Sequence, residues 1–245
     1  MDNIKKTSYS PSELKDINLE YSHDEIIDNL KNDCCEDFVK IFSIINLDNI
    51  NSQTEAEILF SHLTNHPTPI REAMALKLEE IYKEVFLNKY IKEQFLKSII
   101  DINPNVCRSI CAIISKNKPL QTKLIEPLIV KIKELLIEIQ ENDQILGGFY
   151  DNTQKVRKNH AKNKKLFSLY WFLEALSICH DKKHNSEALE IVKKTIKFND
   201  YTIREKSVKI LLNIENCPNE LLNTAKCDQN FYVKNQVCDK INFED

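Results

Sequence analysis

The sequence predicts an all-α protein, and three observations lead to this prediction. The 245 residues include only two glycines and seven prolines, too few for the turns of an all-β sandwich or the loops of a nucleotide-binding α/β fold. Apolar residues recur at steps of three and four, as in Ile70, Met74, Leu78 and Ile81, which is the period of an amphipathic helix. No comparable stretch of the sequence alternates with the period of two that is typical of a strand.

Helix starts are marked by Ser followed three residues later by Glu. In this capping box the hydroxyl and the carboxylate satisfy each other's free backbone N–H groups. The segments that fit are Ser10 to Glu13, Ser22 to Glu25 and Ser52 to Glu55. A further start is predicted at Thr68, because Pro69 is tolerated in a first helical turn, where its missing N–H has no partner to lose.

In chain order, the predicted helices form pairs joined by short connections. The pairs are 22–31 with 34–46, 53–63 with 69–84, 88–100 with 104–116, 120–141 with 160–180, 185–198 with 201–214, and 218–225 with 230–241. Because the connections within most pairs are short, we expect the two helices of a pair to be antiparallel neighbours.

The second helices of four pairs share a pattern. A β-branched residue is followed within two positions by Arg or Lys, and the segment ends on Leu or Ile. The four segments are IREAMA from Ile70, VCRSIC from Val106, IREKSV from Ile203 and VKNQVC from Val233, and the turns before them read NHPTP, INPN, FNDYT and DQNFY. The first two segments lie 36 residues apart and the last two 30 apart, spacings that fall in the range of helical repeats.

This pattern resembles the second helix of HEAT repeats, and Pro127 resembles the proline that often kinks the first helix in that family. The resemblance implies a right-handed α-α superhelix, an armadillo-like, HEAT-like solenoid of about six antiparallel helix pairs. In that family the second helices line the concave face. We therefore expect residues 1–21 to form a tail with a short capping helix, and residues 22–245 to form a single solenoid domain.

The segment 147–165, GGFYDNTQKVRKNHAKNKK, differs from the rest of the chain in composition. It holds both glycines, and the six Lys or Arg and one Asp between 151 and 165 give a charge of +5 in a chain of net charge −3. We expect a basic loop insertion at about 143–165 within the fourth pair, with the glycines ending the preceding helix. The candidate patch for an anionic partner consists of Lys155, Arg157, Lys158, His160, Lys162, Lys164 and Lys165.

Two interpretations of this basic patch stay open. Lys155, Lys158 and Lys162 can share one helical face, which suits phosphates, an acidic protein tail or another anionic surface. Alternatively, the lysines are solvated, or they pair with acidic groups near the end of the preceding helix, such as Glu138 and Glu141.

Other polar residues are candidate contacts or ligands. Arg71 and Arg204 could contact an acidic partner, but the HEAT resemblance favours bonds to acidic or carbonyl groups of adjacent repeats. Cys179, His180 and His184 form a CHxxxH sequence with zinc-ligand side chains. A closed zinc site needs four ligands and no second pair is recognisable, so an ordinary helix end is the favoured interpretation.

Apolar helical runs account for several of the eight cysteines, which favours buried, reduced thiols. Cys107 and Cys111, one turn apart, are predicted to be core contacts rather than a redox pair. The stretch 166–173, LFSLYWFL, is predicted to be a buried helix, with an aromatic platform for a ligand as the alternative.

No catalytic constellation, P-loop or dinucleotide fingerprint occurs in the sequence. We therefore expect a non-enzymatic scaffold or adaptor that binds another protein through its curved helical surface, without a metal or cofactor. The alternatives are nucleic-acid binding through residues 155–165, resembling HEAT-like DNA glycosylases, and an enzyme or chaperone resembling HEAT-type bilin lyases. Because no segment resembles a signal peptide or a membrane span, we expect a cytoplasmic protein without a membrane partner.

Overall fold

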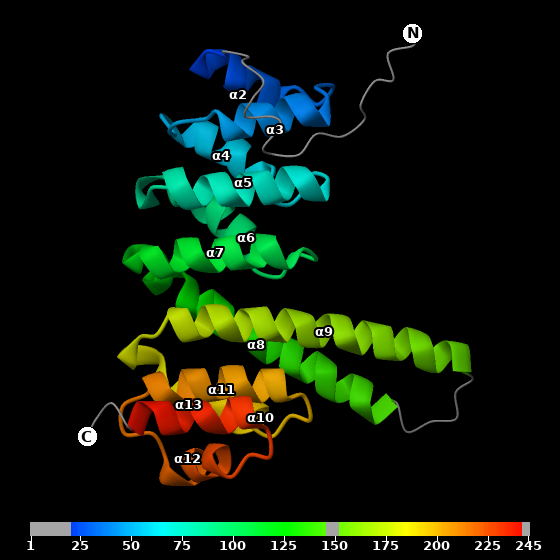
Figure 1. Ribbon diagram of the computed structural model, residues 1–245, viewed down its shortest axis with the longest axis vertical. Helices are drawn as coiled ribbons and strands as arrows, with labels where there is room; N and C mark the ends of the chain where they lie inside the picture. Colours follow the sequence, from blue (N-terminus) through cyan, green and yellow to red (C-terminus); the bar gives the residue numbers. More distant parts are fainter. Residues whose placement is uncertain (1–20, 146–151, 242–245) are drawn as a thin grey trace. The chain divides into compact units, whose positions relative to one another are not determined.

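The computed structural model describes residues 21–145 and 152–241, and it is built from helices (Figure 1). Twelve α-helices and two short 3-10 helices occur in these ranges, without a strand, which confirms the all-α prediction. The chain divides into two compact units, Met1–Ile113 and Ile114–Asp245. The described helices include none that is both long and apolar enough to cross a membrane.

The first unit consists of short helices. They are α2 (His23–Lys31), α3 (Asp37–Ile45), α4 (Gln53–Ser61), α5 (Thr68–Ile81), η1 (Glu84–Phe86), α6 (Lys89–Ser98) and the greater part of α7 (Pro104–Lys116). Helix α3 packs on α5, while α4 packs on both α2 and α6. In the core, the rings of Phe60, Tyr82 and Phe95 contact one another with centroids 4.9 to 5.5 Å apart.

The predicted caps explain where several of these helices begin. Ser22 forms the full capping box, because its hydroxyl accepts from the Glu25 N–H and its own N–H donates to the Glu25 carboxylate at 2.8 Å. The Ser52 hydroxyl likewise accepts from the Glu55 N–H at 3.2 Å. Helix α5 begins at Thr68 with Pro69 in its first turn.

The second unit contains two long α-helices, four shorter α-helices and one 3-10 helix. They are α8 (Lys118–Ile145), α9 (Asn152–Ile178), η2 (Lys182–His184), α10 (Asn185–Thr195), α11 (Tyr201–Asn213), α12 (Asn219–Lys226) and α13 (Phe231–Ile241). Helix α11 is central, since α9, α10, α12 and α13 all pack against it. Helices α9, α11 and α13 therefore form one row, and α8 packs on α10 beside it.

Helix α9 corrects the prediction for the basic segment. The helix begins at Asn152, not near residue 160, so residues 152–165 are helical and not part of a loop. The physical reason is that no Gly or Pro interrupts residues 152–178, and Lys, Arg, Gln and Ala are good helix formers. In Figure 1 the first part of α9 extends beyond the ends of α11 and α13. The two glycines at 147–148 lie outside the described residues.

The single domain over 22–245 stays a prediction beside this division into two compact units. The right-handed superhelix of six pairs stays a prediction, and the predicted tail, apart from Tyr21, lies outside the described residues.

Candidate interaction surface

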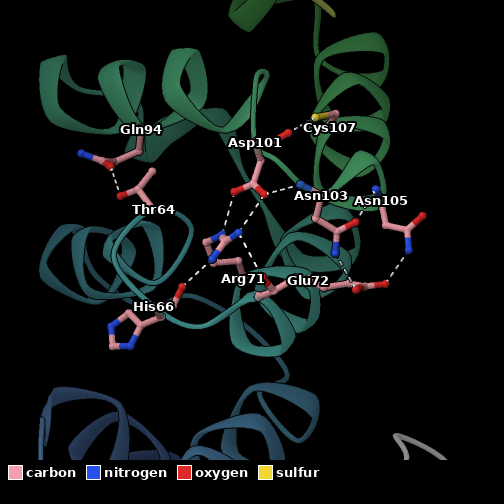
Figure 2. A network of polar contacts seen from close by, with 10 residues as sticks. Thr64, His66, Arg71, Glu72, Gln94, Asp101, Asn103, Asn105 and Cys107 are labelled. Carbon is pink, nitrogen blue, oxygen red and sulfur yellow. Dashed lines mark hydrogen bonds and ion pairs between the residues drawn. The ribbon is translucent and has the colours of Figure 1, made fainter. Parts of the chain in front are cut away.

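Arg71 ties α5 to the turn before α7 within the first unit (Figure 2). Its Nε and Nη2 donate to the two carboxylate oxygens of Asp101 at 2.7 and 3.0 Å, and its Nη1 donates to the His66 carbonyl at 2.6 Å. The Arg71 and Asp101 side chains are only 12% and 9% exposed. The hydrogen bonds to Asp101 raise the pKa of Arg71. These hydrogen bonds confirm the interpretation that Arg71 bonds acidic and carbonyl groups within the chain.

The turn that receives Arg71 is itself held by side chains. The Asp101 carboxylate accepts from the Asn103 N–H at 2.7 Å, and the Asn103 side-chain carbonyl accepts from the Asn105 N–H at 2.9 Å. The amides of both asparagines donate to Glu72, the neighbour of Arg71, at 2.8 Å (Figure 2). A pair of adjacent charged residues on α5 thus fixes the start of α7.

Arg204 repeats this arrangement in the second unit. Its Nε and Nη2 donate to the Asp228 carboxylate at 2.7 and 2.9 Å, and its Nη1 donates to the carbonyls of Phe198 and Asn199. The hydrogen bonds from Arg204 lower the pKa of Asp228. Arg204 therefore holds the turn before α11 against the turn before α13.

Three aromatic side chains are exposed where these two turns lead into helices. Tyr201 is the first residue of α11, and Phe231 and Tyr232 are the first two of α13. Their exposed fractions are 42%, 67% and 63%. The Tyr201 and Tyr232 rings stack with centroids 6.3 Å apart, and Phe231 lies edge-on to Tyr232 at 5.8 Å. These three residues are called the aromatic cluster below.

The carboxylates beside the aromatic cluster are engaged by neighbouring groups. Asp200 accepts from the Thr202 N–H and hydroxyl at 2.9 and 2.7 Å, and Asp228 is paired with Arg204. Glu205 accepts from the Gln236 amide at 3.1 Å. By contrast, three exposed lysines form no ion pair with a carboxylate of the described chain: Lys197, Lys226 and Lys234.

The predicted basic patch is only partly free. Arg157, His160 and Lys164 are exposed, and their spacing of three and four residues places them on one face of α9. Lys165 pairs with Glu138 at 3.0 Å, which confirms internal pairing for that residue. Lys162 also has an interaction partner. The side chains of Lys155, Lys158 and Glu141 lie outside the described part, so their predicted roles stay predictions.

The cysteine and histidine candidates occupy helix interiors and a helix end. Cys107 and Cys111 are buried, as predicted for core contacts. Cys179 is buried at the end of α9, and burial raises the pKa of its thiol to about 12. His184 lies in η2, with its Nδ1 3.6 Å from the Asp181 carboxylate and its Nε2 3.5 Å from Glu126.

A small pocket lies beside this helix end, lined in part by Ser177, His180 and Asn213. Asn213 uses its side-chain amide to bond the Ser177 carbonyl at 2.8 Å. Within residues 21–145 and 152–241, no three His, Cys, Asp or Glu side chains are placed to hold a metal ion. The residues that line the pocket come from α8, α9, α10 and α11 and from the turn around η2.

The aromatic stretch of α9 is mainly core. Leu169, Trp171, Phe172 and Leu173 are at most 7% exposed, which confirms the predicted buried helix. Tyr170 is half-buried, and the Lys206 ammonium lies 4.8 Å from its ring centroid.

Sequence reasoning missed a charged cluster that joins α9 to α11. The Glu174 carboxylate lies 3.0 Å from the Lys206 ammonium and 2.6 Å from that of Lys209. Burial alone would raise the pKa of Glu174, but the hydrogen bond from Lys209 and the charge of Lys206 lower it overall. Lys206 is buried at 8% exposure, so this cluster stabilises packing between the two helices rather than forming an open site.

Sequence reasoning also missed the aromatic cluster, although a signal was present. In the turns FNDYT and DQNFY, Tyr201 and Phe231 each stand two residues before the β-branched residue that opens the shared pattern. Aligning the two repeats would have placed these rings at equivalent positions, side by side if the second helices pack together.

Comparison with models of known protein families gives no match to this chain, and comparison with curated proteins gives none either.

Proposed function

We propose that the chain is a non-enzymatic helical scaffold that binds another protein, with the aromatic cluster as part of the binding surface. The observation that carries this proposal is the exposure of three adjacent aromatic side chains, two of them more than 60% exposed. Isolated exposed apolar residues are common, but contiguous groups mark interaction sites. Tyrosine is enriched among the residues that dominate protein–protein binding energy, and aromatic residues in general are enriched at interfaces.

The cluster is also built to bind with little loss of conformational freedom. Tyr201 and Tyr232 stack on each other, and Arg204 fixes the turns that lead into both helices. A side chain that is already held in place loses less entropy when a partner covers it. The cluster therefore has the rigidity expected of an interface anchor.

The larger architecture that we propose is a HEAT-like, right-handed α-α solenoid of about six helix pairs. The row α9, α11 and α13 in the second unit supports it. The ion pair that Arg71 and Arg204 each form with an Asp in a later turn also supports it. In such a solenoid the aromatic cluster would stand at one end of the second helices. We further propose a cytoplasmic location.

Nucleic-acid binding is the second candidate, favoured by the exposed face that Arg157, His160 and Lys164 form on α9. Phosphate binding draws its affinity from many cations, so three side chains, one of them a histidine, predict weak and salt-sensitive binding. A gel-shift titration of the whole chain with duplex DNA and with RNA at low salt tests this candidate. If the chain binds nucleic acid tightly and the double variant Arg157→Gln, Lys164→Gln abolishes this binding, nucleic-acid binding becomes the first candidate function.

The proposed function is tested by quantitative affinity purification from the native host. A tagged chain is compared with the variant Tyr201→Ala, Phe231→Ala, Tyr232→Ala. Because these side chains are exposed, the variant should fold, as circular dichroism and a thermal melt would check. We expect at least one protein to be recovered with the unmodified chain and depleted about tenfold or more with the variant.

Phe38→Ala is the matched control, because Phe38 is an exposed aromatic residue of the first unit at 39% exposure. This control should retain the same partner. If the triple variant and the unmodified chain recover the same set of proteins in equal amounts, the aromatic cluster is not the binding surface and the proposal fails.

A further inference from the structure

We infer that the aromatic cluster receives an acidic protein segment that carries apolar side chains. This inference rests on the proposed function and adds the chemistry of the partner. It is argued from the charges that surround the three rings, because the rings alone would accept many apolar groups.

The free charges beside the cluster are positive. Lys197 lies in the turn before Tyr201, Lys226 is the last residue of α12 before the turn that leads to Phe231, and Lys234 follows Phe231 by three residues on α13. Residues three apart on a helix are neighbours, so Lys234 lies on the same side of α13 as Phe231. All three lysines are exposed. No salt bridge joins any of them to a carboxylate of the described residues, although the charge of Lys234 helps to lower the pKa of Asp228.

The two carboxylates beside the cluster are already bonded within the chain. Asp228 is 8% exposed and paired with Arg204, while Asp200 caps α11 by accepting hydrogen bonds from Thr202. A cationic partner would therefore meet three exposed lysines and two carboxylates that already have hydrogen-bond donors. An acidic partner would meet complementary charge, which speeds association and disfavours wrong partners.

The N-terminal ends of α11 and α13 also favour an anionic partner. The N-terminal end of a helix carries a partial positive charge, and α11 and α13 both begin at the cluster. The Thr202 and Tyr232 N–H groups are already bonded to Asp200 and Asn230. The three lysines and the partial positive charge of the two helix ends would therefore recognise the anionic groups. The backbone N–H groups at these two positions would not, because they already have partners.

Other occupants fit these observations less well. A proline-rich segment gains nothing from three lysines, although it would pack on aromatic rings. A single-stranded nucleic acid stacks on aromatic rings but needs a basic groove that follows its backbone. An acidic segment with Leu or Phe side chains uses both the rings and the lysines.

The inference is tested by fluorescence titration of the whole chain with a defined peptide in which glutamates alternate with leucine and phenylalanine. Matched probes replace every glutamate with lysine, or use a proline-rich sequence, or use single-stranded RNA. We expect the acidic peptide to bind best. Tyr232→Ala should weaken it about tenfold. The variant Lys197→Gln, Lys226→Gln, Lys234→Gln should weaken it by a similar factor at about 50 mM salt and by much less at about 300 mM, where screening is stronger.

The control variant is Lys118→Gln, Lys123→Gln, Lys183→Gln, which removes three exposed lysines from α8 and η2 of the second unit. It should leave the affinity for the acidic peptide unchanged. The inference is overturned if the acidic peptide does not bind, if another probe binds as well, or if both lysine variants weaken binding equally. In each of these cases a partner that depends on the three aromatic residues would still support the proposed function.

Discussion

At the scale of single residues, His62 is the clearest titratable group in the core. It is 2% exposed and stacks on His66 with ring centroids 4.1 Å apart. Its Nδ1 lies 2.8 Å from the Ile58 carbonyl, and because a carbonyl only accepts, Nδ1 carries the proton. Nε2 is then unprotonated and buried, and it has no hydrogen-bond partner among the described residues. Burial, helped by the charges of His66 and Lys40, lowers the pKa of His62 to about 4.

This lowered pKa predicts that acid destabilises the fold. The unfolded chain takes up a proton near the ordinary histidine pKa of 6.5, whereas the folded chain does so only near 4. The stabilisation is therefore complete above about pH 6.5 and is lost as the pH falls toward 4. We expect His62 to account for roughly 2 kcal/mol of the fall in unfolding free energy between about pH 7.5 and pH 5.

Denaturant unfolding at several pH values measures this effect. His62→Gln should flatten the dependence of the unfolding free energy on pH, whatever it does to stability at pH 7.5. His160→Gln, which removes an exposed histidine from α9, is the control. An unchanged pH dependence in His62→Gln would show that His62 is not the responsible group.

At the scale of elements, an ion pair between Arg and Asp connects one helix to the turn before a later helix. Arg71 and Arg204 each reach an Asp in a later turn, 30 and 24 residues on, and each also bonds carbonyls of its own preceding turn. Arg108 is the basic residue of the same pattern on α7, one position further from the β-branched residue, and it is exposed and bonds Asn105, three residues away, at 2.6 Å. Residues that look alike in sequence thus differ in what they hold together.

This difference predicts unequal effects of substitution on stability. Arg71→Ala leaves the buried Asp101 carboxylate without its cation, so we expect a loss of roughly 3 kcal/mol in unfolding free energy. Arg108→Ala removes only a local, exposed hydrogen bond, and we expect a loss below about 0.5 kcal/mol. Chemical denaturation of both variants makes the comparison.

A double-mutant cycle with Asp101→Ala separates the pair energy from other effects of truncation. The losses from Arg71→Ala and Asp101→Ala should be strongly non-additive. Additive losses, or equal losses at Arg71 and Arg108, would contradict the structural role of the tie.

At the scale of the whole molecule, the sequence predicted the helices better than the surface. Helix periods and caps are local, so the predicted helix ranges agree with the observed helices to within a few residues except at α9. There, the glycines and the charge suggested a loop, although Lys and Arg are compatible with helix. The Glu174 cluster and the aromatic cluster depend on which helices become neighbours, and the periods of single helices do not contain that information.

The HEAT resemblance predicted that Arg71 and Arg204 bond acidic or carbonyl groups within the chain, although Arg108 of the same pattern bonds Asn105 of its own helix instead. The exposure of Tyr201, Phe231 and Tyr232 depends on what packs against the ends of α11 and α13. The same limit applies to charge. Counting residues predicts one basic segment, but ion pairs such as Lys165 with Glu138 decide which cations stay free. Surface properties therefore need the tertiary contacts.

The central claim is that a protein partner covers the aromatic cluster, and site-specific photo-crosslinking in the native host tests it most directly. A photoreactive phenylalanine analogue would replace Tyr232, and in a separate chain it would replace Phe38 as the control. We predict a covalent adduct with a protein at position 232 that does not form at position 38. Equal adducts at both positions, an adduct with nucleic acid, or no adduct at position 232 would contradict the claim.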